Sequence, residues 1–138
     1  MFVMNTTANP EIAEQQRVLI NPVILDRKGT IEGDEGCLSF PDLYQKVRRA
    51  RNVVVRAYNL KGDSVEVQAA ELAARVWQHE VDHLHGILFI DKVGAIAKLA
   101  SRSTLKEFER DFRRSQERGE IPPDADLERV IATLEANA

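Results

Sequence analysis

The sequence has a single cysteine, Cys37, among its 138 residues, so no intramolecular disulfide can form. It also has no uninterrupted apolar run approaching the roughly 18 residues that a membrane-spanning helix needs. Its first residues lack both the basic start and the long apolar centre of a secretory signal. We therefore expect a cytoplasmic protein with no membrane partner, and nothing indicates an oxidising compartment.

An excess of one charge sign is missing as well. The chain has 19 basic and 22 acidic residues, which gives a formal net charge of −3. This balance offers no electrostatic argument for nucleic acid or an anionic membrane as a partner. With 43% hydrophobic and 30% charged residues, a chain of this length can bury a core and fits one compact soluble domain.

Strand patterns dominate the first part of the chain. Residues 2–5 are typical of a short strand, after which Asn9 and Pro10 indicate a polar loop. Residues 17–26 are rich in β-formers, and Asn21-Pro22 interrupts them. A proline cannot donate to a strand ladder, so this stretch is predicted to be an edge strand or to bend.

The middle of the chain contains one clear hairpin and one ambiguous segment. Residues 32–41 hold two glycines and a proline around the cysteine, and we predict an irregular loop or extended stretch there. Residues 52–59 and 64–68 alternate as strands on either side of a polar turn. This pattern predicts a β-hairpin.

Helical patterns fill the rest of the chain. Residues 69–86 predict a helix that ends at a glycine, residues 86–90 a short apolar strand or extended run, and residues 95–120 an amphipathic helix stopped by Pro122-Pro123. A last short helix follows. The predicted class is α+β, with antiparallel strands packed on a central helix and a C-terminal helical tail. We expect residues 1–94 to form the core and residues 95–138 the tail.

The central helix carries the motif His79-Glu80-Val81-Asp82-His83. Residues four apart lie on one helical face, so both imidazoles can reach the same metal ion. Glu80 follows the first histidine and flanks the open side of such an ion. From there its carboxylate can move a proton as a general acid/base. The spacing thus supplies two ligands and a base from about one turn of helix.

Two histidines do not complete a catalytic metal site, which usually has three protein ligands and a water. Thermolysin-like enzymes add a downstream glutamate, and metzincins a third histidine at a spacing where Phe89 stands here. The other obvious soft donor is Cys37, whose thiolate would bind an ion tightly. A thermolysin-like protease would leave the cysteine motif unexplained, and a purely structural zinc site would need a fourth ligand, which is not evident.

The alternative explanation is that the HExxH motif at residues 79–83 occurs by chance and binds no metal. Polar helix faces produce HExxH by chance, and a lone cysteine is more often a small buried hydrophobe. However, His79 and His83 share a face with Leu72 and Val76, so we expect them to point inward. Two inward imidazoles beside a glutamate are best explained by an ion.

Two segments carry a family resemblance. Residues 35–39 (EGCLS) resemble the EGCLS motif of peptide deformylases, and residues 78–86 (QHEVDHLHG) resemble their QHExDHLxG motif. The order of the motifs, their separation and the hairpin between them also fit. The resemblance extends over about residues 17–93 and joins two motifs of different ligand chemistry.

The resemblance implies a hydrolase that removes the formyl group from the N-terminal methionine of newly made polypeptides and releases formate. It implies that Cys37, His79 and His83 bind the metal, that Glu80 is the general acid/base, and that the backbone N–H of Leu38 helps to bind the oxyanion. The family's usual ion is Fe²⁺, with Zn²⁺ or Ni²⁺ substituting. The implied substrates are N-formylmethionyl nascent peptides, and the ribosome is a candidate partner, although the mixed charges of the tail give this little support.

One family motif is missing. Deformylases carry GxGLAAxQ near the N-terminus, and its glutamine helps to stabilise the oxyanion. Residues 2–5 look like the strand that follows this motif, so we expect the chain to begin just downstream of it. Loss of one oxyanion donor costs about 10²–10³ in rate. A catalytically impaired, deformylase-like metal-binding protein is therefore the alternative function.

Several neighbours of the motifs have open roles. Gly36 and Tyr44 are candidate substrate-binding residues; Gly36 would also give backbone freedom beside the metal, and core packing is the alternative for Tyr44. Asp82 is either a solvated carboxylate or a partner of Arg49, a pairing that fits the family pattern. We also predict that Gln78 gives structural support, that Trp77 lies in the core and that His85 lies on the surface.

Overall fold

The computed structural model describes residues 1–5 and 16–136. The loop expected around Asn9 and Pro10 therefore lies outside the described residues. The chain divides into two compact units, Met1–Lys98 and Leu99–Ala138, which we describe separately. None of the helices in the described part is both long enough and apolar enough to cross a bilayer.

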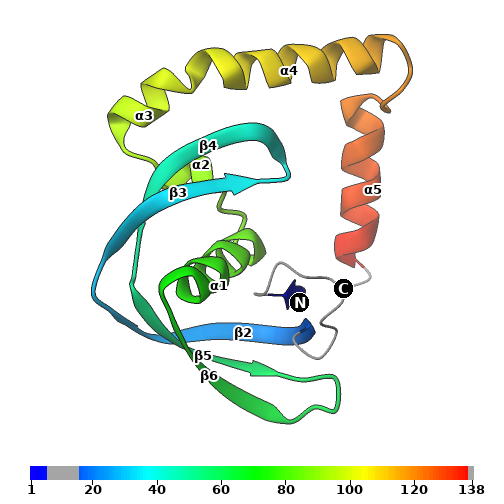
Figure 1. Cartoon of the computed structure of the whole chain (residues 1–138). Helices are drawn as coiled ribbons and strands as arrows, with labels where there is room; N and C mark the ends of the chain where they lie inside the picture. Colours follow the sequence, from blue (N-terminus) through cyan, green and yellow to red (C-terminus); the bar gives the residue numbers. More distant parts are fainter. Residues whose placement is uncertain (6–15, 137–138) are drawn as a thin grey trace. The chain divides into compact units, whose positions relative to one another are not determined.

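The first unit contains a four-stranded antiparallel sheet (Figure 1). Its strands are β1 (Phe2–Asn5), β2 (Gln16–Lys28), β5 (Asn52–Tyr58) and β6 (Ser64–Ala70), in the order β1-β2-β5-β6. The predicted hairpin is confirmed, because β5 pairs with β6 from Asn52↔Ala70 to Tyr58↔Ser64. Alternate residues of β5 are buried, which places one face of the sheet against the core.

Asn21 and Pro22 interrupt the regular pairing of strand β2. The register of β2 against β5 shifts between Ile20 and Val23, and Asn21 has a φ of 48°. A bulge accommodates a proline that has no N–H to donate. The bend is therefore confirmed, but the edge-strand alternative was wrong, because β2 lies between β1 and β5.

A second, two-stranded sheet consists of β3 (Ile31–Cys37) and β4 (Phe40–Arg49). Of the two alternatives for residues 32–41, the extended stretch is confirmed and the irregular loop was wrong, because regular pairing runs from Ile31↔Arg49 to Gly36↔Tyr44. The glycines and charges of this segment hid the strand pattern. Leu38 and Ser39 form the turn of this hairpin.

Helix α1 (Glu71–Leu84) lies between the four-stranded sheet and the β3–β4 hairpin (Figure 1). Its buried face includes Ala74, Trp77 and Val81, which join the core with Phe2 and residues of β2 and β5. The rings of Trp77 and Phe2 meet edge to face at 5.7 Å. Burying each such large apolar side chain contributes roughly 2–3 kcal/mol, so this face fixes the helix on the sheet.

Gln78 fastens the same helix to the end of β4. Its side-chain amide donates to the carbonyl of Ala50 at 2.9 Å, and its carbonyl accepts from the N–H of Ala50 at 3.0 Å. The structural role predicted for Gln78 and the core position predicted for Trp77 are both confirmed.

The chain after α1 differs from the prediction. The strand or extended run expected at residues 86–90 was wrong for its last two residues, because Phe89–Lys92 form a short helix, α2, after the extended Leu88. Leu88 donates its N–H to the Asp91 side chain at 3.0 Å, which closes this turn. Phe89 is fully buried and packs edge to face on Phe40, so the apolar run serves to anchor the hairpin.

The C-terminal part is helical, as expected. Helix α3 (Ala95–Ala100) spans the boundary of the two units, and the second unit holds α4 (Arg102–Glu117) and α5 (Asp124–Ala136). The single helix predicted for residues 95–120 is interrupted at Ser101. The α+β class with antiparallel strands and C-terminal helices is confirmed. The division into a catalytic core of residues 1–94 and a tail stays a prediction.

Candidate metal centre

Cys37 is the last residue of β3 and lies at the turn of the hairpin. Burial raises the pKa of the Cys37 thiol. Hydrogen bonds from the backbone and side chain of Ser39, together with the nearby His79, outweigh burial and lower that pKa below its ordinary value. The turn therefore favours the thiolate, which is the form of cysteine that binds metals.

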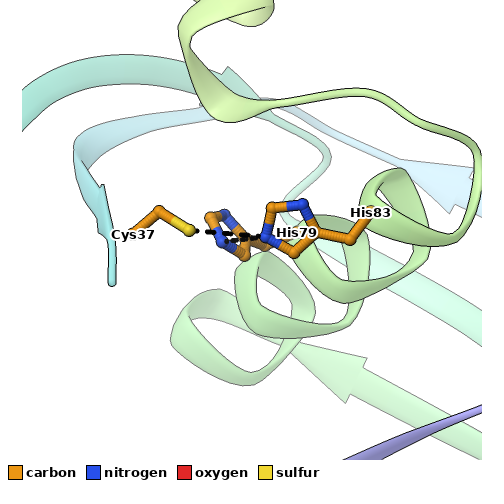
Figure 2. Close-up of side chains that lie close together, drawn as sticks. All are labelled: Cys37, His79 and His83. Atoms are coloured by element: carbon orange, nitrogen blue, oxygen red, sulfur yellow. Dashed lines mark hydrogen bonds between the residues drawn. The ribbon is translucent and has the colours of Figure 1, made fainter. Parts of the chain in front are cut away.

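His79 and His83 lie one turn apart on α1, and their side chains meet the cysteine (Figure 2). The Nε2 atoms of the two rings are 3.0 Å apart, and the Cys37 Sγ lies 3.5 Å from the Nε2 of His83. One donor atom from each of the three residues lies within 4.8 Å of the others. The structure thus brings together all three residues that the sequence singled out as ligands.

The spacing of these atoms fits a single ion. Metal–nitrogen bonds of about 2.0–2.1 Å and a metal–sulfur bond of about 2.3 Å in a tetrahedron separate two nitrogens by about 3.4 Å, and sulfur from nitrogen by about 3.6 Å. The distances of 3.0 and 3.5 Å in the cluster are close to these values. One sulfur and two imidazole nitrogens suit ions such as Fe²⁺, Zn²⁺ or Ni²⁺ better than Mg²⁺ or Ca²⁺.

The two histidines line a cleft at the edge of the core. The expectation that they point inward holds for His79, whose side chain is 11% exposed and contacts the buried Glu35, and less for His83. The face they share with Leu72 and Val76 is exposed or half-buried, whereas the buried face of α1 is offset toward Trp77. The cleft has a volume of about 450 Å³ and lies between α1 and the end of β3. Glu80 lines the same cleft, so its carboxylate and the cluster open to the same space.

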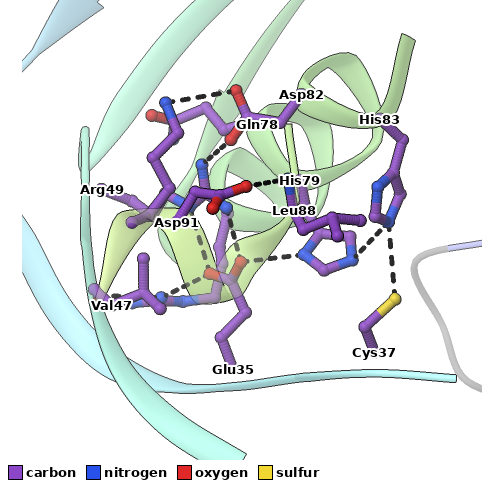
Figure 3. A network of polar contacts seen from close by, with 12 residues as sticks. Glu35, Cys37, Val47, Arg49, Gln78, His79, Asp82, His83, Leu88 and Asp91 are labelled. Atoms are coloured by element: carbon purple, nitrogen blue, oxygen red, sulfur yellow. Dashed lines mark hydrogen bonds and ion pairs between the residues drawn. The ribbon is translucent and has the colours of Figure 1, made fainter. Parts of the chain in front are cut away.

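The carboxylate of Glu35 is buried and contacts His79 on the side of the ring that faces away from Cys37 (Figure 3). Glu35 is 6% exposed, and its Oε1 lies 2.8 Å from the Nδ1 of His79. A carboxylate only accepts hydrogen bonds, so the Nδ1 of His79 donates and its Nε2 is left to face Cys37 and His83. Such a contact fixes both the tautomer and the orientation of the ring.

Two arginines complete this network. Arg49 donates from Nη2 and Nε to Glu35 at 2.5 and 3.1 Å, and Arg75 donates from Nη1 to the same carboxylate at 3.0 Å. Arg49 also pairs with Asp82, so the partner predicted for Asp82 is confirmed. Within residues 1–5 and 16–136, no buried side-chain nitrogen or oxygen lacks a hydrogen-bond partner.

The charges of the network shift its pKa values. Burial raises the pKa of Glu35, but hydrogen bonds from His79, Arg49 and Arg75 lower it to about 2. The hydrogen bond to Glu35 raises the pKa of His79 above its ordinary value, against burial, which lowers it. Glu35 is thus held ionised, as its role as acceptor for His79 requires.

Sequence reasoning missed the roles of Glu35 and Arg75. Glu35 precedes Cys37 by two residues on a strand, and Arg75 precedes His79 by four on a helix, so each shares a face with a candidate ligand. This spacing was the available signal. It was overlooked because charged residues usually indicate a solvated surface.

The remaining candidates lie around the rim of the cleft. Leu38 follows Cys37 in the turn, and its fully exposed side chain lines the cleft. A Cβ at Gly36 would lie 2.6 Å from the ring of Tyr44, so only glycine allows this ring to cover the backbone beside the cysteine. Tyr44 is exposed, which excludes core packing. His85 is exposed as predicted and contacts the carbonyl of Val81.

Comparison with known proteins gives consistent matches. A sequence model of the polypeptide deformylase family matches residues 1–99. A peptide deformylase of Rhodopirellula baltica is 39% identical over 136 residues, which cover 99% of this chain and 67% of that protein. A peptide deformylase of Acidobacterium capsulatum is 48% identical over 88 residues, which cover 64% of this chain and 52% of that protein.

A solved structure shares the fold. The crystal structure of peptide deformylase 1B from Arabidopsis thaliana, in complex with an inhibitor, matches with a TM-score of 0.77 and 32% identity. The match covers 88% of this chain and 66% of that one. The chain thus spans between about half and two thirds of the length of these proteins.

Proposed function

The chain belongs to the polypeptide deformylase family, and from this premise we propose that it hydrolyses the N-formyl amide of formylmethionyl peptides. The products would be formate and a peptide with a free N-terminal amine. The nascent chains that carry this group are made in the cytoplasm, where we place the reaction. The charges of both signs in residues 95–138 give little electrostatic support for a contact with the ribosome.

We assign Cys37, His79 and His83 as the ligands of one divalent ion, Fe²⁺ in the cell, with Zn²⁺ or Ni²⁺ as substitutes. When bound, such an ion polarises a carbonyl oxygen and acidifies water. The observation that supports this assignment is the convergence of one sulfur and two ring nitrogens within 4.8 Å of one another. These atoms come from two separate elements, the end of β3 and one turn of α1.

The proposed catalytic groups of the chain surround that convergence. Glu80 follows His79 and lines the same cleft, so its carboxylate can take a proton from the attacking water and return it to the departing amine. The backbone N–H of Leu38, next to Cys37, is proposed to donate to the formyl oxygen as negative charge develops there. A formyl group is small, so a narrow site next to the cluster would exclude acetylated and internal amides.

Gly36 and Tyr44 are proposed to contribute to substrate binding. Together with Leu38 they line a second hollow of about 330 Å³ next to the cysteine. The exposed ring of Tyr44 lies against the backbone of Gly36 and offers an apolar surface to a peptide. Truncating Tyr44 to alanine should therefore raise KM for formyl-Met peptides more than it lowers kcat.

The test is formate release from formyl-Met-Ala-Ser by the purified chain, loaded with Fe²⁺ without oxygen or with Ni²⁺ in air. We expect formate in proportion to the metal bound, and a rate about 10²–10⁴-fold lower from Glu80→Gln. Acetyl-Met-Ala-Ser serves as the matched control substrate and should not be cleaved. Cleavage of both peptides would contradict the proposed selectivity.

A chain that binds one ion per molecule but releases no formate would instead be the catalytically impaired metal-binding protein. A chain that neither binds metal nor releases formate would contradict both readings. Metal content, measured by atomic emission after desalting, separates these two outcomes.

A further inference from the structure

We propose that Arg75 is a positioning residue of the metal centre, which holds the Glu35 carboxylate in the orientation that accepts the Nδ1 proton of His79. Through this contact, Arg75 would direct the Nε2 of His79 toward Cys37 and His83. The inference rests on the proposed function, because it concerns the ligand set assigned there.

Arg75 joins three elements of the fold. It lies on α1, one turn before His79, and its side chain is 9% exposed. From one nitrogen, Nη1, it donates to the Glu35 carboxylate on β3 at 3.0 Å and to the Val47 carbonyl on β4 at 3.1 Å. The guanidinium therefore fixes the helix that carries the histidines to both strands of the hairpin that carries the cysteine.

The strand leaves room for this side chain at Gly33. A Cβ at Gly33 would lie 2.9 Å from the Nη2 of Arg75, which is too close for an alanine without a shift. The guanidinium thus packs directly on the backbone of β3, two residues before Glu35. Its planar fork is restrained from both sides, by Gly33 and by its two acceptors.

The hydrogen bonds of Glu35 are divided between its two oxygens. Oε1 accepts from His79 at 2.8 Å and from the Nη2 of Arg49 at 2.5 Å. Oε2 accepts from the Nε of Arg49 at 3.1 Å and from Arg75 at 3.0 Å. An ionised carboxylate has about four acceptor directions, so this arrangement occupies them all and leaves a single orientation for the group.

The two arginines do not have equivalent roles. Arg49 forms ion pairs with both Glu35 and Asp82. Asp82 also pairs with Lys92, whose Nζ lies 3.5 Å from the Asp82 Oδ1. Arg75 pairs with Glu35 and with a backbone carbonyl. Removing Arg75 would leave Oε2 held by the shared Arg49, so the carboxylate could rotate away from His79 while Asp82 keeps its partners.

The expected consequence is weaker metal binding with the fold retained. Partners of a ligating histidine typically change metal affinity by 10- to 100-fold when they are mutated. We expect Arg75→Met, which keeps the apolar stem, to weaken Co²⁺ binding within this range. Arg75→Lys restores one donor and should recover part of the affinity.

The matched control is Arg51→Met. Arg51 pairs with Glu71 at the start of the same helix, at 3.5 Å, but its side chain is 53% exposed and it does not contact Glu35. Both substitutions remove one arginine from one ion pair of α1. The control therefore separates a loss of helix pairing from a loss of ligand orientation.

The experiment measures Co²⁺ affinity by competition with a chelator, at a temperature where circular dichroism shows each variant folded. A second readout is the tautomer of His79 in the metal-free chain, from long-range ¹⁵N–¹H correlation spectra. We expect the proton on Nδ1 in the wild type and a mixture of tautomers in Arg75→Met, with Arg51→Met like the wild type in both readouts. If Arg75→Met does not fold, Arg75→Gln, which also removes the positive charge, carries the same test.

Unchanged affinity and an unchanged tautomer in the folded Arg75 variant would overturn the proposal, as would an equal loss of affinity in Arg51→Met. Formate release by the wild type is assayed separately. A wild type that binds Co²⁺ without releasing formate would contradict the proposed activity but not the role of Arg75. A wild type that does not bind Co²⁺ would contradict both.

Discussion

Arginine–carboxylate pairs occur in two regions of this molecule with almost the same length. In the first unit, Arg49 and Glu35 approach to 2.5 Å, and their side chains are 4% and 4% exposed. In the second unit, Arg113 and Asp124 join α4 to the start of α5 at 2.6 Å, with side chains 52% and 50% exposed. An arginine–carboxylate ion pair is thus buried in the first unit and exposed to solvent in the second.

The surroundings decide what each pair can do. A buried pair loses its hydration, so all of its donors and acceptors need protein partners, and breaking it leaves an uncompensated charge at a cost of about 3–5 kcal/mol. An exposed pair contributes roughly 0–1 kcal/mol, because water replaces either partner. The buried network can therefore hold the ring of His79 in one orientation, whereas the exposed pair only links the end of α4 to the start of α5.

The largest expected difference between the regions is catalytic. Glu80→Gln should lower the rate of formate release by about 10²–10⁴-fold with the metal content unchanged, because a positioned acid/base contributes this much. Arg113→Met in the second unit should leave the rate within about twofold of the wild type. Steady-state kinetics with formyl-Met-Ala-Ser measures both rates. An equal loss of rate in the two variants would contradict the difference expected between the two regions.

The next difference is in stability. Arg49→Met should lower the free energy of unfolding by about 3–5 kcal/mol, because it removes donors from both Glu35 and Asp82. The same change at Arg113 should leave the midpoint of urea unfolding nearly unchanged, because water replaces the lost partner. Urea unfolding of the metal-free chain measures both values. A loss below about 1 kcal/mol for Arg49→Met would show that the buried network is dispensable.

The pH dependence of stability sharpens the same contrast. The folded pKa of Glu35 is lowered to about 2 from 4.5, so its stabilisation is fully present above pH 4.5 and is lost as the pH falls toward 2. The loss amounts to roughly 3 kcal/mol at about 1.4 kcal/mol per pKa unit. Unfolding measured from pH 6 to 2 should give a steep profile for the wild type and a flatter one for Glu35→Gln.

Asp124 is the control for this profile. Its pKa is also lowered, by hydrogen bonds from Gln116 and Arg113, but half of the side chain is exposed to solvent. Asp124→Asn should therefore follow the wild-type profile. A profile that flattens in Asp124→Asn and not in Glu35→Gln would reverse the assignment.

The smallest effect separates backbone strain from charge within the hairpin. Asp42 has a φ of 60°, in the left-handed region that favours glycine. Asp42→Gly should raise the free energy of unfolding by up to about 1 kcal/mol, because relief of the left-handed strain exceeds the entropy cost of glycine. Asp34→Gly, at an exposed position of β3 with no positive φ, should lower it instead. If both changes act in the same direction, the charge and not the backbone is responsible.

The same contrast explains which parts could be predicted from the sequence. The convergence of His79 and His83 follows from helical spacing, and the β5–β6 hairpin follows from alternation around a polar turn. Helices α4 and α5 were likewise visible as periodic segments, although the interruption at Ser101 was not. These features depend on local patterns, which sequence displays directly.

Features that depend on burial of charge were not visible. Glu35 and Arg75 look like surface residues until the hairpin and α1 enclose them. An extended stretch was only one of two alternatives for β3, because its buried position is occupied by Glu35. Arg49 was linked to Asp82 only through the family pattern. Tertiary contacts thus determine the role of a charged residue, and its partner cannot be identified from a single sequence.

The most direct test of the account is a titration of the metal-free chain with Co²⁺, followed by absorption spectroscopy. The wild type should bind one ion per chain and show a thiolate-to-metal charge-transfer band, which Cys37→Ser should lose while it keeps weaker binding through His79 and His83. Persistence of that band in Cys37→Ser, or no equimolar binding by the wild type, would contradict the claim that these three residues hold one ion.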